Sequence, residues 1–215
     1  MTKVNAGIAE AFDAMEPVYD EHVRRIGYFA PEWIDRHAGD FPGEGEFQVL
    51  DLGCGTGSNV EELCKRRGTV RAEGVDVSPK MIERARSTGR YEKLYTRDLN
   101  FALEIPSDTF DLVIAFGFSE WLTDLNTCLS EGHRVLKPGG ALWASFRRFE
   151  AGDEGSPPRF FDTPCGRLSG HSAGEILHMM SRLKMSVTGL DAVTGYTTTA
   201  GFTCPYYIVR SRKEL

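Results

Sequence analysis

The sequence predicts an α/β fold built on a mostly parallel sheet with helices on both faces. Between Phe47 and Phe146, apolar segments alternate with segments of helical period, a pattern typical of parallel sheets. A glycine-rich turn ends the first apolar segment. Two apolar segments near the C-terminus are joined by a short Gly/Thr-rich link, which indicates an antiparallel hairpin.

The first forty residues have the pattern of amphipathic helices. Apolar residues at positions 8, 11, 12 and 15 recur at helical spacing, and Pro17 interrupts the pattern before residues 18–23 resume it. Pro31 is a favoured first residue of a helix, so a second short helix carrying Trp33 is expected there. Residues 39–45 are expected to form a loop.

The remaining elements follow from the same patterns. The expected strands are residues 47–52, 70–77, 91–96, 110–116, 141–146, 185–196 and 202–210, and the expected helices are residues 59–67, 78–87, 122–136 and 172–183. Gly68 closes the first of these helices, Ser78 and Pro79 begin the second, and Pro138 stops the third. The fourth strand is apolar almost throughout, so we expect it to be buried on both faces.

The length of 215 residues fits a single domain. We divide it into an N-terminal helical cap (residues 1–45), a core that binds a ligand (46–146), a loop on the acceptor side (147–171), and a C-terminal helix and hairpin (172–215). Residues 147–170 have no helical or strand period, and a loop of that length is usually functional or disordered.

Composition limits the possible partners and compartments. The net charge of −6 and the pI near 5.4 argue against nucleic acid as a partner. The sequence has five cysteines, an odd number, and no CxxC pair. This pattern does not favour a disulfide framework or a zinc site. The chain shows no signal peptide, and its longest apolar stretch is too short to cross a membrane. We therefore expect a cytoplasmic protein; its oligomeric state stays open.

The glycine-rich turn indicates a nucleoside-binding site. Gly53, Gly55 and Gly57 allow positive φ angles and close approach of a ligand, and the following helix N-terminus favours an anionic group. Ser58 stands where the dinucleotide fingerprint has its third glycine, which argues against NAD or FAD. Asp76, at the end of the second strand, suits ribose hydroxyls; the alternative is a solvated turn residue.

Five segments in this order resemble the class I S-adenosylmethionine-dependent methyltransferases. They are residues 49–57 (VLDLGCGTG), 74–81 (GVDVSPKM), 96–99 (TRDL), 110–115 (FDLVIA) and 134–140 (RVLKPGG). The resemblance implies a Rossmann-like, seven-stranded sheet and S-adenosylmethionine as cofactor. A weaker resemblance, in residues 17–20 and 85–95, is to the methyltransferase-like 27 or Williams–Beuren region subgroup.

The resemblance also implies a role for individual residues. Gly53, Gly55 and Asp51 would hold the methionine part of the cofactor, and the subgroup places Tyr19 near it. Ala115 would lie beneath the sulfonium. The ribose and the adenine would be held by Asp76, Val77, Met81, Asp98 and Leu99. For Tyr19, Met81 and Asp98 the alternative is an ordinary packing or turn residue.

Candidate acceptor residues come from segments expected above the carboxyl ends of the strands. They are Tyr28, Phe116, Phe118, Trp121 and Arg147, with His171 as a candidate general base. Core packing for Trp121, a solvated charge for Arg147, and helix capping for His171 stay open as alternatives. No metal constellation is evident in the sequence.

The function that we expect is methyl transfer to an O, N or S atom of a small molecule. Such a transfer needs alignment and desolvation more than a catalytic dyad. One alternative is a cofactor-binding subunit without turnover that acts through a partner protein. Another is an NAD-dependent oxidoreductase, against which Ser58 already argues.

Overall fold

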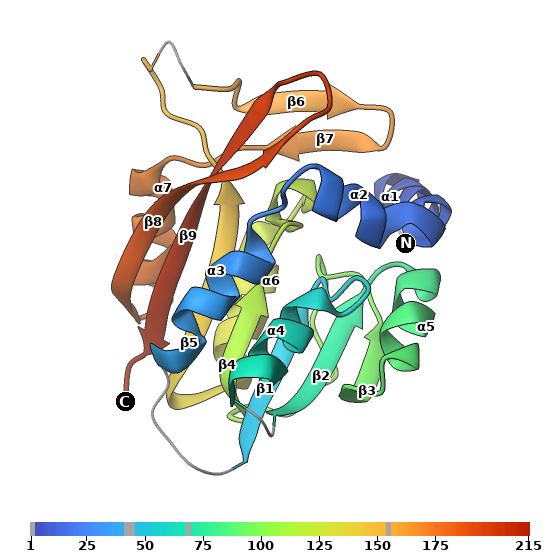
Figure 1. Ribbon diagram of the computed structural model, residues 1–215. Coiled ribbons are helices and arrows are strands. Elements are labelled where there is room, and N and C mark those ends of the chain that lie inside the picture. Colours follow the sequence, from blue (N-terminus) through green and yellow to red (C-terminus); the bar gives the residue numbers. More distant parts are fainter. Residues whose placement is uncertain (1–2, 41–45, 68–69, 154–155) are drawn as a thin grey trace.

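A computed structural model describes residues 3–40, 46–67, 70–153 and 156–215. Its centre is a seven-stranded sheet in the order β3-β2-β1-β4-β5-β9-β8 (Figure 1). Strands β1 to β5 pair in parallel, and β9 pairs antiparallel with β5 and β8. The predicted parallel sheet and the predicted C-terminal hairpin are both confirmed.

The bounds of the elements agree with the sequence patterns in most places. The strands of the large sheet are β1 (Phe47–Leu52), β2 (Val70–Asp76), β3 (Tyr91–Thr96), β4 (Phe110–Ala115), β5 (Leu136–Arg147), β8 (Met185–Thr197) and β9 (Thr203–Lys213). The helices are α1 (Lys3–Met15), α2 (Tyr19–Arg25), α3 (Ala30–His37), α4 (Ser58–Arg67), α5 (Pro79–Ser87), α6 (Leu125–Val135) and α7 (Ala173–Arg182). Gly68 and residues 41–45, expected as a helix end and a loop, lie outside the described residues.

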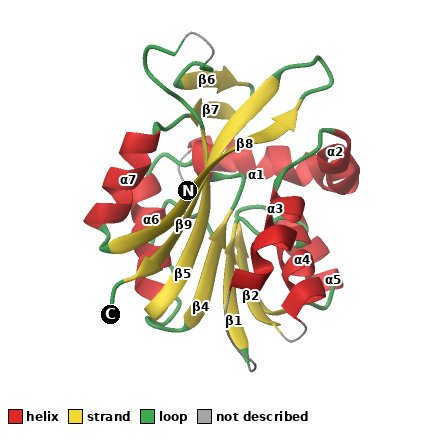
Figure 2. Ribbon diagram, turned by 60° about the vertical axis from the view of Figure 1, so that its left-hand side comes forward, coloured by secondary structure: helices red, strands yellow, loops and turns green. Residues whose placement is uncertain are grey.

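Helices cover both faces of the sheet. Figure 2 shows α3, α4 and α5 on one side and α6 and α7 on the other. Successive residues of β4 supply the two cores: Leu112 and Ile114 pack toward α3 and α4, and Val113 and Ala115 pack toward α6 and α7. This explains why β4 is apolar throughout, as predicted for a strand buried on both faces.

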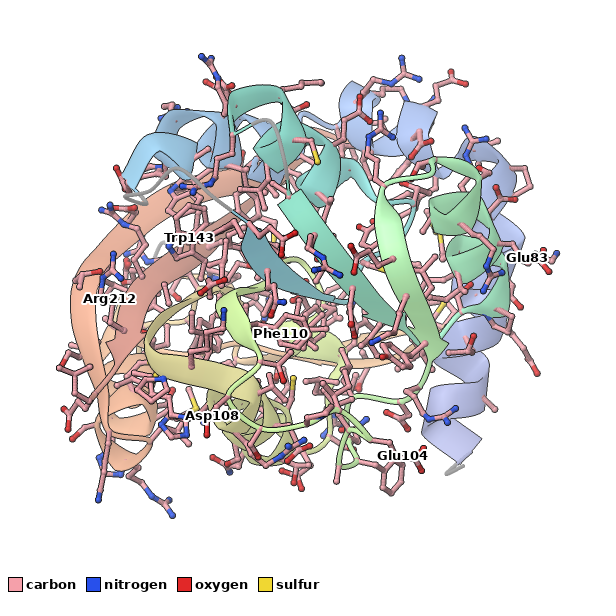
Figure 3. The ribbon with its side chains drawn as sticks, turned by 90° about the horizontal axis from the view of Figure 1, so that it is seen from below. Glu83, Glu104, Asp108, Phe110, Trp143 and Arg212 are labelled. Carbon is pink, nitrogen blue, oxygen red and sulfur yellow. The ribbon has the colours of Figure 1, made fainter. Side chains whose placement is uncertain are left out.

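Figure 3 shows the molecule from the amino ends of the parallel strands. Seen from that side, Phe110 and Trp143 lie inside, whereas Glu83, Glu104 and Arg212 point outward at the rim (Figure 3). The rings of Trp33 and Trp143 meet edge to face, with centroids 5.1 Å apart. The opposite end, where the carboxyl ends of the strands meet, is the open one.

The bounds of two segments differ from the prediction, one because of a helix cap and one because of strand pairing. The predicted helix 122–136 begins later, at Leu125, because Asp124 accepts a hydrogen bond from the backbone N–H of Thr127 and so caps it. Residues 137–140, expected as a turn, lie inside β5. There the register against β4 shifts, so that Phe110 pairs with Leu136 and Leu112 with Ala141.

The expected acceptor-side loop (147–171) is only partly irregular. Strands β6 (Phe160–Thr163) and β7 (Gly166–Ser169) form an antiparallel hairpin within it. The prediction of a segment without secondary structure is therefore wrong for these residues. Sequence patterns do not reveal short strands that lack a regular apolar period. Such strands are stabilised by pairing with each other, and neither needs a buried apolar face.

The N-terminal helices form a cap that is tied to the core by side chains. As predicted, Pro17 breaks the first helix, with a 3₁₀ turn at Glu16–Val18 between α1 and α2. Asp13 of α1 accepts hydrogen bonds from the Ser78 hydroxyl and the Lys80 backbone N–H at the start of α5. On α2, Asp20 accepts a hydrogen bond from the Thr56 hydroxyl. These contacts place the cap over the carboxyl ends of β1 and β2.

Candidate functional site

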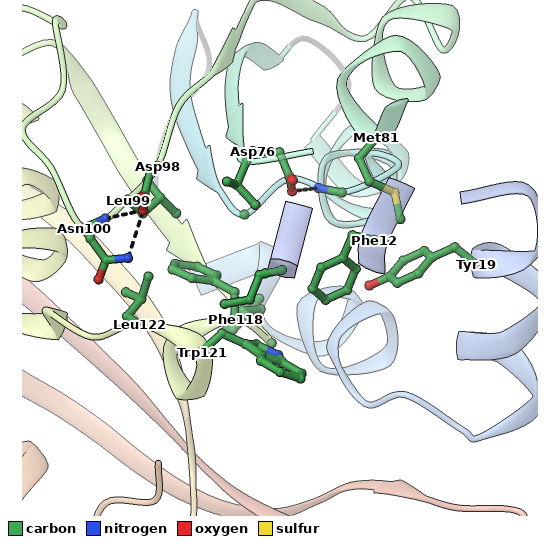
Figure 4. Close-up of a pocket in the computed structure, with 16 residues that line it drawn as sticks. Phe12, Tyr19, Asp76, Met81, Asp98, Leu99, Asn100, Phe118, Trp121 and Leu122 are labelled. Atoms are coloured by element: carbon green, nitrogen blue, oxygen red, sulfur yellow. Dashed lines mark hydrogen bonds between the residues drawn. The ribbon is translucent and has the colours of Figure 1, made fainter. Parts of the chain in front are cut away.

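A cavity lies at the carboxyl ends of β1, β2 and β4, where the strand order reverses. Such a reversal is the usual ligand site of an open α/β sheet. The cavity and the open solvent at its mouth together span about 680 Å³ (Figure 4). Its lining residues are Ile8, Phe12, Tyr19, Gly53, Gly55, Asp76, Val77, Met81, Asp98, Leu99, Asn100, Phe116, Gly117, Phe118, Trp121 and Leu122.

The glycine turn forms one wall, and its backbone requires glycine. Gly53, Gly55 and Gly57 have φ angles of 68°, 51° and 96°. The N–H of Gly53 donates to the carbonyl of Val75 at 2.8 Å, which fastens the turn to β2. A Cβ on Gly53 would lie 2.4 Å from Cδ1 of Phe118, so any other residue there would collide with that ring.

Asp76 links the glycine turn to the start of α5. Its Oδ2 accepts from the N–H of Gly55 and its Oδ1 from the N–H of Ser78, both at 2.9 Å. Burial raises the pKa of Asp76, and these backbone donors oppose the rise. A carboxylate has about four acceptor positions. Asp76 can therefore accept further hydrogen bonds from hydroxyl groups in the cavity.

Asp98 and Asn100 form the wall beyond β3. Oδ1 of Asp98 accepts from both the N–H and the side-chain amide of Asn100, at 3.0 and 2.8 Å. The amide oxygen of Asn100 in turn accepts from the N–H groups of Thr123 and Asp124, ahead of α6. Leu99 is buried beside them. This network links the segment that follows β3 to the segment that follows β4, and it leaves the Asp98 carboxylate at the cavity.

Asp51 lies beneath the turn and is fully buried. Its Oδ2 accepts from the Tyr91 hydroxyl at 2.8 Å, whereas its Oδ1 has no hydrogen-bond partner among the described residues. Burial raises the pKa of Asp51 to about 7, against the opposing effects of the Tyr91 and Asn59 side chains. A buried carboxylate oxygen without a partner is suited to a cationic group of a ligand.

The cap supplies an aromatic wall opposite the glycine turn. The ring of Phe12 meets those of Tyr19 and Trp121 edge to face, at centroid distances of 6.3 and 6.1 Å. Figure 4 shows Phe12 and Tyr19 on the side of Met81, and Trp121 close to Phe118. Burial raises the pKa of Tyr19, so its hydroxyl stays protonated. The cavity is thus polar along β1, β2 and β3, and apolar on the side of the cap.

Tyr28 reaches the cavity from behind. Its hydroxyl lies against Gly117, where a Cβ would be only 2.1 Å from Oη. Gly117 has a φ of 73° and lines the cavity. Burial also raises the pKa of Tyr28 well above its ordinary value. Tyr28 is therefore a neutral phenol at the boundary of the cavity.

The structure brings most of the candidate residues together. The cavity is lined by Tyr19, Gly53, Gly55, Asp76, Val77, Met81, Asp98 and Leu99 of the cofactor set, and by Phe116, Phe118 and Trp121 of the acceptor set. Asp51 lies beneath the turn and Tyr28 behind Gly117. Ala115 does not line the cavity; it is buried in the sheet, directly before the lining residue Phe116.

Arg147 and His171 are not among the lining residues. Both guanidinium NH groups of Arg147 donate to the carbonyl of Pro158 at 2.9 Å, so Arg147 holds the segment before β6. The His171 ring packs on Phe146, and its Nε2 lies 3.4 Å from the Ser169 hydroxyl. Burial lowers the pKa of His171. Their side chains are engaged in structural contacts at the base of the β6–β7 hairpin.

Five lining residues were not selected as site residues from the sequence. They are Ile8, Phe12, Asn100, Gly117 and Leu122. The helical spacing of Ile8 and Phe12 indicated a buried stripe, but not that the stripe would cover a cavity. Asn100 directly follows a candidate residue, and its amide could have been expected to fix the preceding carboxylate.

Comparison with known proteins identifies the family. Residues 50–144 match the family model described as a methyltransferase domain. The chain is 30% identical over 196 residues to the demethylmenaquinone methyltransferase of Tropheryma whipplei, covering 89% of this chain and 71% of that one. It is 35% identical over 140 residues to human methyltransferase-like protein 27, covering 63% and 56%. A malonyl-[acyl-carrier protein] O-methyltransferase of Halorhodospira halophila is 38% identical, but only 35% of its length is spanned.

Solved structures share the fold over nearly the whole chain. A methyltransferase of Haloferax volcanii, in complex with the Trm112 activator, has a TM-score of 0.74 at 18% identity and covers 97% of this chain and 98% of that one. The 1,6-didemethyltoxoflavin-N1-methyltransferase of Burkholderia thailandensis, with S-adenosylhomocysteine bound, has a TM-score of 0.70 at 18% identity, covering 98% and 88%. These structures show the shared fold. The identity to the Tropheryma whipplei enzyme, over 71% of its length, shows that the chain belongs to the class I S-adenosylmethionine-dependent methyltransferases, the family that its motifs predicted.

Proposed function

We propose that this protein transfers a methyl group from S-adenosylmethionine to a small-molecule acceptor. The observation that carries the proposal is the cavity at the strand reversal. It gathers the glycine turn after β1, Asp76 at the end of β2 and Asp98 after β3. These groups suit an amino acid, a ribose and an adenine in that order along the carboxyl edge of the sheet.

The cofactor would be held by residues of the turn and of the strand ends. Asp51, whose Oδ1 has no hydrogen-bond partner among the described residues, would help to fix the ammonium group of the cofactor directly or through water, and the turn at Gly53 and Gly55 would hold the methionine chain. Asp76 retains acceptor capacity for the ribose hydroxyls. Asp98, Leu99 and Met81 would surround the adenine, with Val77 against the sugar; Ala115 and Tyr19 would lie near the methionine end.

The bound cofactor supplies an activated methyl group, so the protein mainly has to align the acceptor and exclude water. The rings of Phe12, Phe118 and Trp121 form an apolar enclosure on the acceptor side. Aromatic walls with few polar groups suit a small, partly apolar molecule. The named acceptors of the relatives differ widely, among them demethylmenaquinone, trans-aconitate and 1,6-didemethyltoxoflavin. We infer a small-molecule acceptor that is methylated at an O, N or S atom.

Calorimetry tests the cofactor site directly. We expect S-adenosylmethionine and S-adenosylhomocysteine each to bind with one site per chain, while NAD does not bind. An Asp76→Asn variant is a close control, because it keeps the shape and removes the charge. Absence of binding by both sulfur compounds would overturn the proposal.

A second candidate is a cofactor-binding subunit that acts through a partner protein. The ring of Phe118 packs directly over Gly53, which narrows the end of the cavity where the methionine chain would lie. Binding of S-adenosylhomocysteine together with no transfer to any acceptor would favour this candidate. Replacing Phe118 by Ala would then be expected to raise cofactor affinity without producing turnover.

A further inference from the structure

Asn100 is a cavity residue whose side chain joins two segments that are far apart in sequence. It lines the cavity two residues after Asp98. Its amide nitrogen donates to Oδ1 of Asp98 at 2.8 Å, a contact drawn in Figure 4. Its amide oxygen accepts from the backbone N–H groups of Thr123 and Asp124, at 2.8 and 2.7 Å, and from the Thr123 hydroxyl at 3.0 Å. One side chain thus links the segment after β3 to the segment that precedes α6.

These tertiary contacts determine which way round the amide of Asn100 lies. The backbone N–H groups of Thr123 and Asp124 can only donate, so the amide must present its oxygen to them and its NH₂ group to Asp98. The backbone N–H of Asn100 also donates to Oδ1 of Asp98, at 3.0 Å, in a local Asx turn. The local turn needs only the backbone of Asn100, whereas the amide contact depends on the segment before α6.

Two donors on one oxygen hold the Asp98 carboxylate in one orientation at the cavity. Both Asp98 and Asn100 are lining residues. Leu99, between them in sequence, is 6% exposed and belongs to the core cluster against which Leu122 packs. Val77, Leu99 and Leu122 are apolar members of the same lining. The Asp98 carboxylate is therefore a fixed acceptor in a lining that is otherwise apolar on this side.

We propose that Asn100 is a positioning residue that makes the site selective for a base with an exocyclic amino group. The proposal rests on the function proposed above, in which Asp98 lies at the adenine. An exocyclic amino group donates a hydrogen bond, which a carboxylate held in place accepts. A carbonyl oxygen at the same position is itself an acceptor, so a fixed carboxylate disfavours it. Asn100 acts through Asp98, and its own orientation comes from residues 23 and 24 positions further along the chain.

Asp124 provides a structural contrast within the same network. Its carboxylate accepts from the backbone N–H and the hydroxyl of Thr127, at 3.0 and 2.7 Å, and so caps α6. Asp124 is not among the lining residues. Its contact with the Asn100 oxygen is made by the backbone N–H, which an alanine keeps. Asp124→Ala therefore weakens the segment before α6 without removing a side-chain contact to Asn100 or Asp98 that is described above.

Calorimetry on the full chain tests the proposal through a ratio of two dissociation constants. The ligands are S-adenosylhomocysteine and S-inosylhomocysteine, which carries a carbonyl oxygen in place of the exocyclic amino group. We expect the wild-type chain to bind the adenosyl compound at least about tenfold more tightly, as for a hydrogen bond to a charged group. Asn100→Ala should lower this preference by at least about threefold, because Asp98 loses a donor that orients it. A role in stability alone would weaken the binding of both compounds equally and leave the ratio unchanged.

Asp124→Ala is the matched control: its unfolding midpoint in urea should fall, whereas its ratio should stay within about twofold of wild type. Asn100→Asp replaces Asn100→Ala if that variant does not fold. It keeps an oxygen for the N–H groups of Thr123 and Asp124 but loses the donor to Asp98, so its ratio should also fall by at least about threefold.

A smaller fall, in whichever variant of Asn100 folds, would overturn the proposal. Equal binding of the two compounds by the wild-type chain would overturn it too, as would a fall in Asp124→Ala as large as that in Asn100→Ala. Failure of the wild-type chain to bind S-adenosylhomocysteine would instead overturn the proposed function.

Discussion

The cavity has two halves, for which we propose a cofactor role and an acceptor role, and they are built in different ways. The proposed cofactor half consists of backbone in a special conformation and of carboxylates fixed by backbone N–H groups, in and directly after the segment from β1 to β3. The proposed acceptor half consists of side chains from α1 and from the turn after β4, which are far apart in sequence.

On the proposed function, this difference corresponds to the two ligands of the reaction. Backbone geometry around Gly53 and Asp76 would recognise the cofactor, the constant part of the reaction. The rings of Phe12 and Trp121 would surround the acceptor, the part that varies between relatives. Rigid backbone favours a constant ligand, whereas side chains can change without disturbing the sheet.

The largest effect should follow from placing a side chain in the turn. Gly53→Ala combines a left-handed backbone with a collision against Phe118, so we expect the free energy of unfolding to fall by about 2–5 kcal/mol. Urea denaturation measures this value. Gly89→Ala is the matched control, because Gly89 has a φ of 67° and a Cβ added there would meet no described atom within 4 Å. Equal losses in both variants would show that Phe118 is not packed on the turn.

The charge of Asp76 should contribute most to cofactor affinity. Asp76→Ala removes the acceptor for ribose hydroxyls and leaves the N–H groups of Gly55 and Ser78 unpaired. We expect affinity for S-adenosylhomocysteine to fall by about 1–3 kcal/mol, measured by calorimetry. An unchanged affinity would return Asp76 to the role of a turn residue and would break the distinction between the two halves.

Cofactor affinity should also depend on pH through Asp51. Because burial raises the pKa of Asp51 to about 7, the carboxyl group carries a proton at lower pH and must lose it to pair with an ammonium group. The dissociation constant should therefore rise by up to about tenfold per pH unit below pH 7 and level off above it. Asp51→Asn should remove this dependence; a pH-independent wild-type affinity would exclude a direct pairing.

The smallest effect concerns the attachment of the cap. Asp13 caps the start of α5 through Ser78 and Lys80, so Asp13→Ala should lower the free energy of unfolding by about 0.5–2 kcal/mol. Cofactor affinity should change less than threefold. The control is Glu32→Ala, which removes an exposed pair with Arg36 and should matter less. A larger loss of cofactor affinity than of stability would place Asp13 in the cofactor half.

Sequence patterns predicted most of the residues that line the cavity along β1, β2 and β3, because the determinants of their positions are local; their roles toward the cofactor stay predictions. The glycines, Asp76 and Asp98 stand within or directly after their strands, and parallel strands bring their carboxyl ends to one edge. The acceptor half was predicted only in part. Phe116, Phe118 and Trp121 line the cavity, but Arg147 is bound to a backbone carbonyl and His171 packs at the base of the hairpin.

The sequence by itself determined the alternation of strands and helices, the turn that only glycine can form, and the family. These depend on backbone sterics and on apolar period, which act over a few residues. Only the tertiary structure decided that β6 and β7 pair, that Phe12 meets Trp121, and that Tyr206 binds Glu120 across 86 residues. Such contacts depend on how separate elements pack, and no short-range pattern encodes that packing.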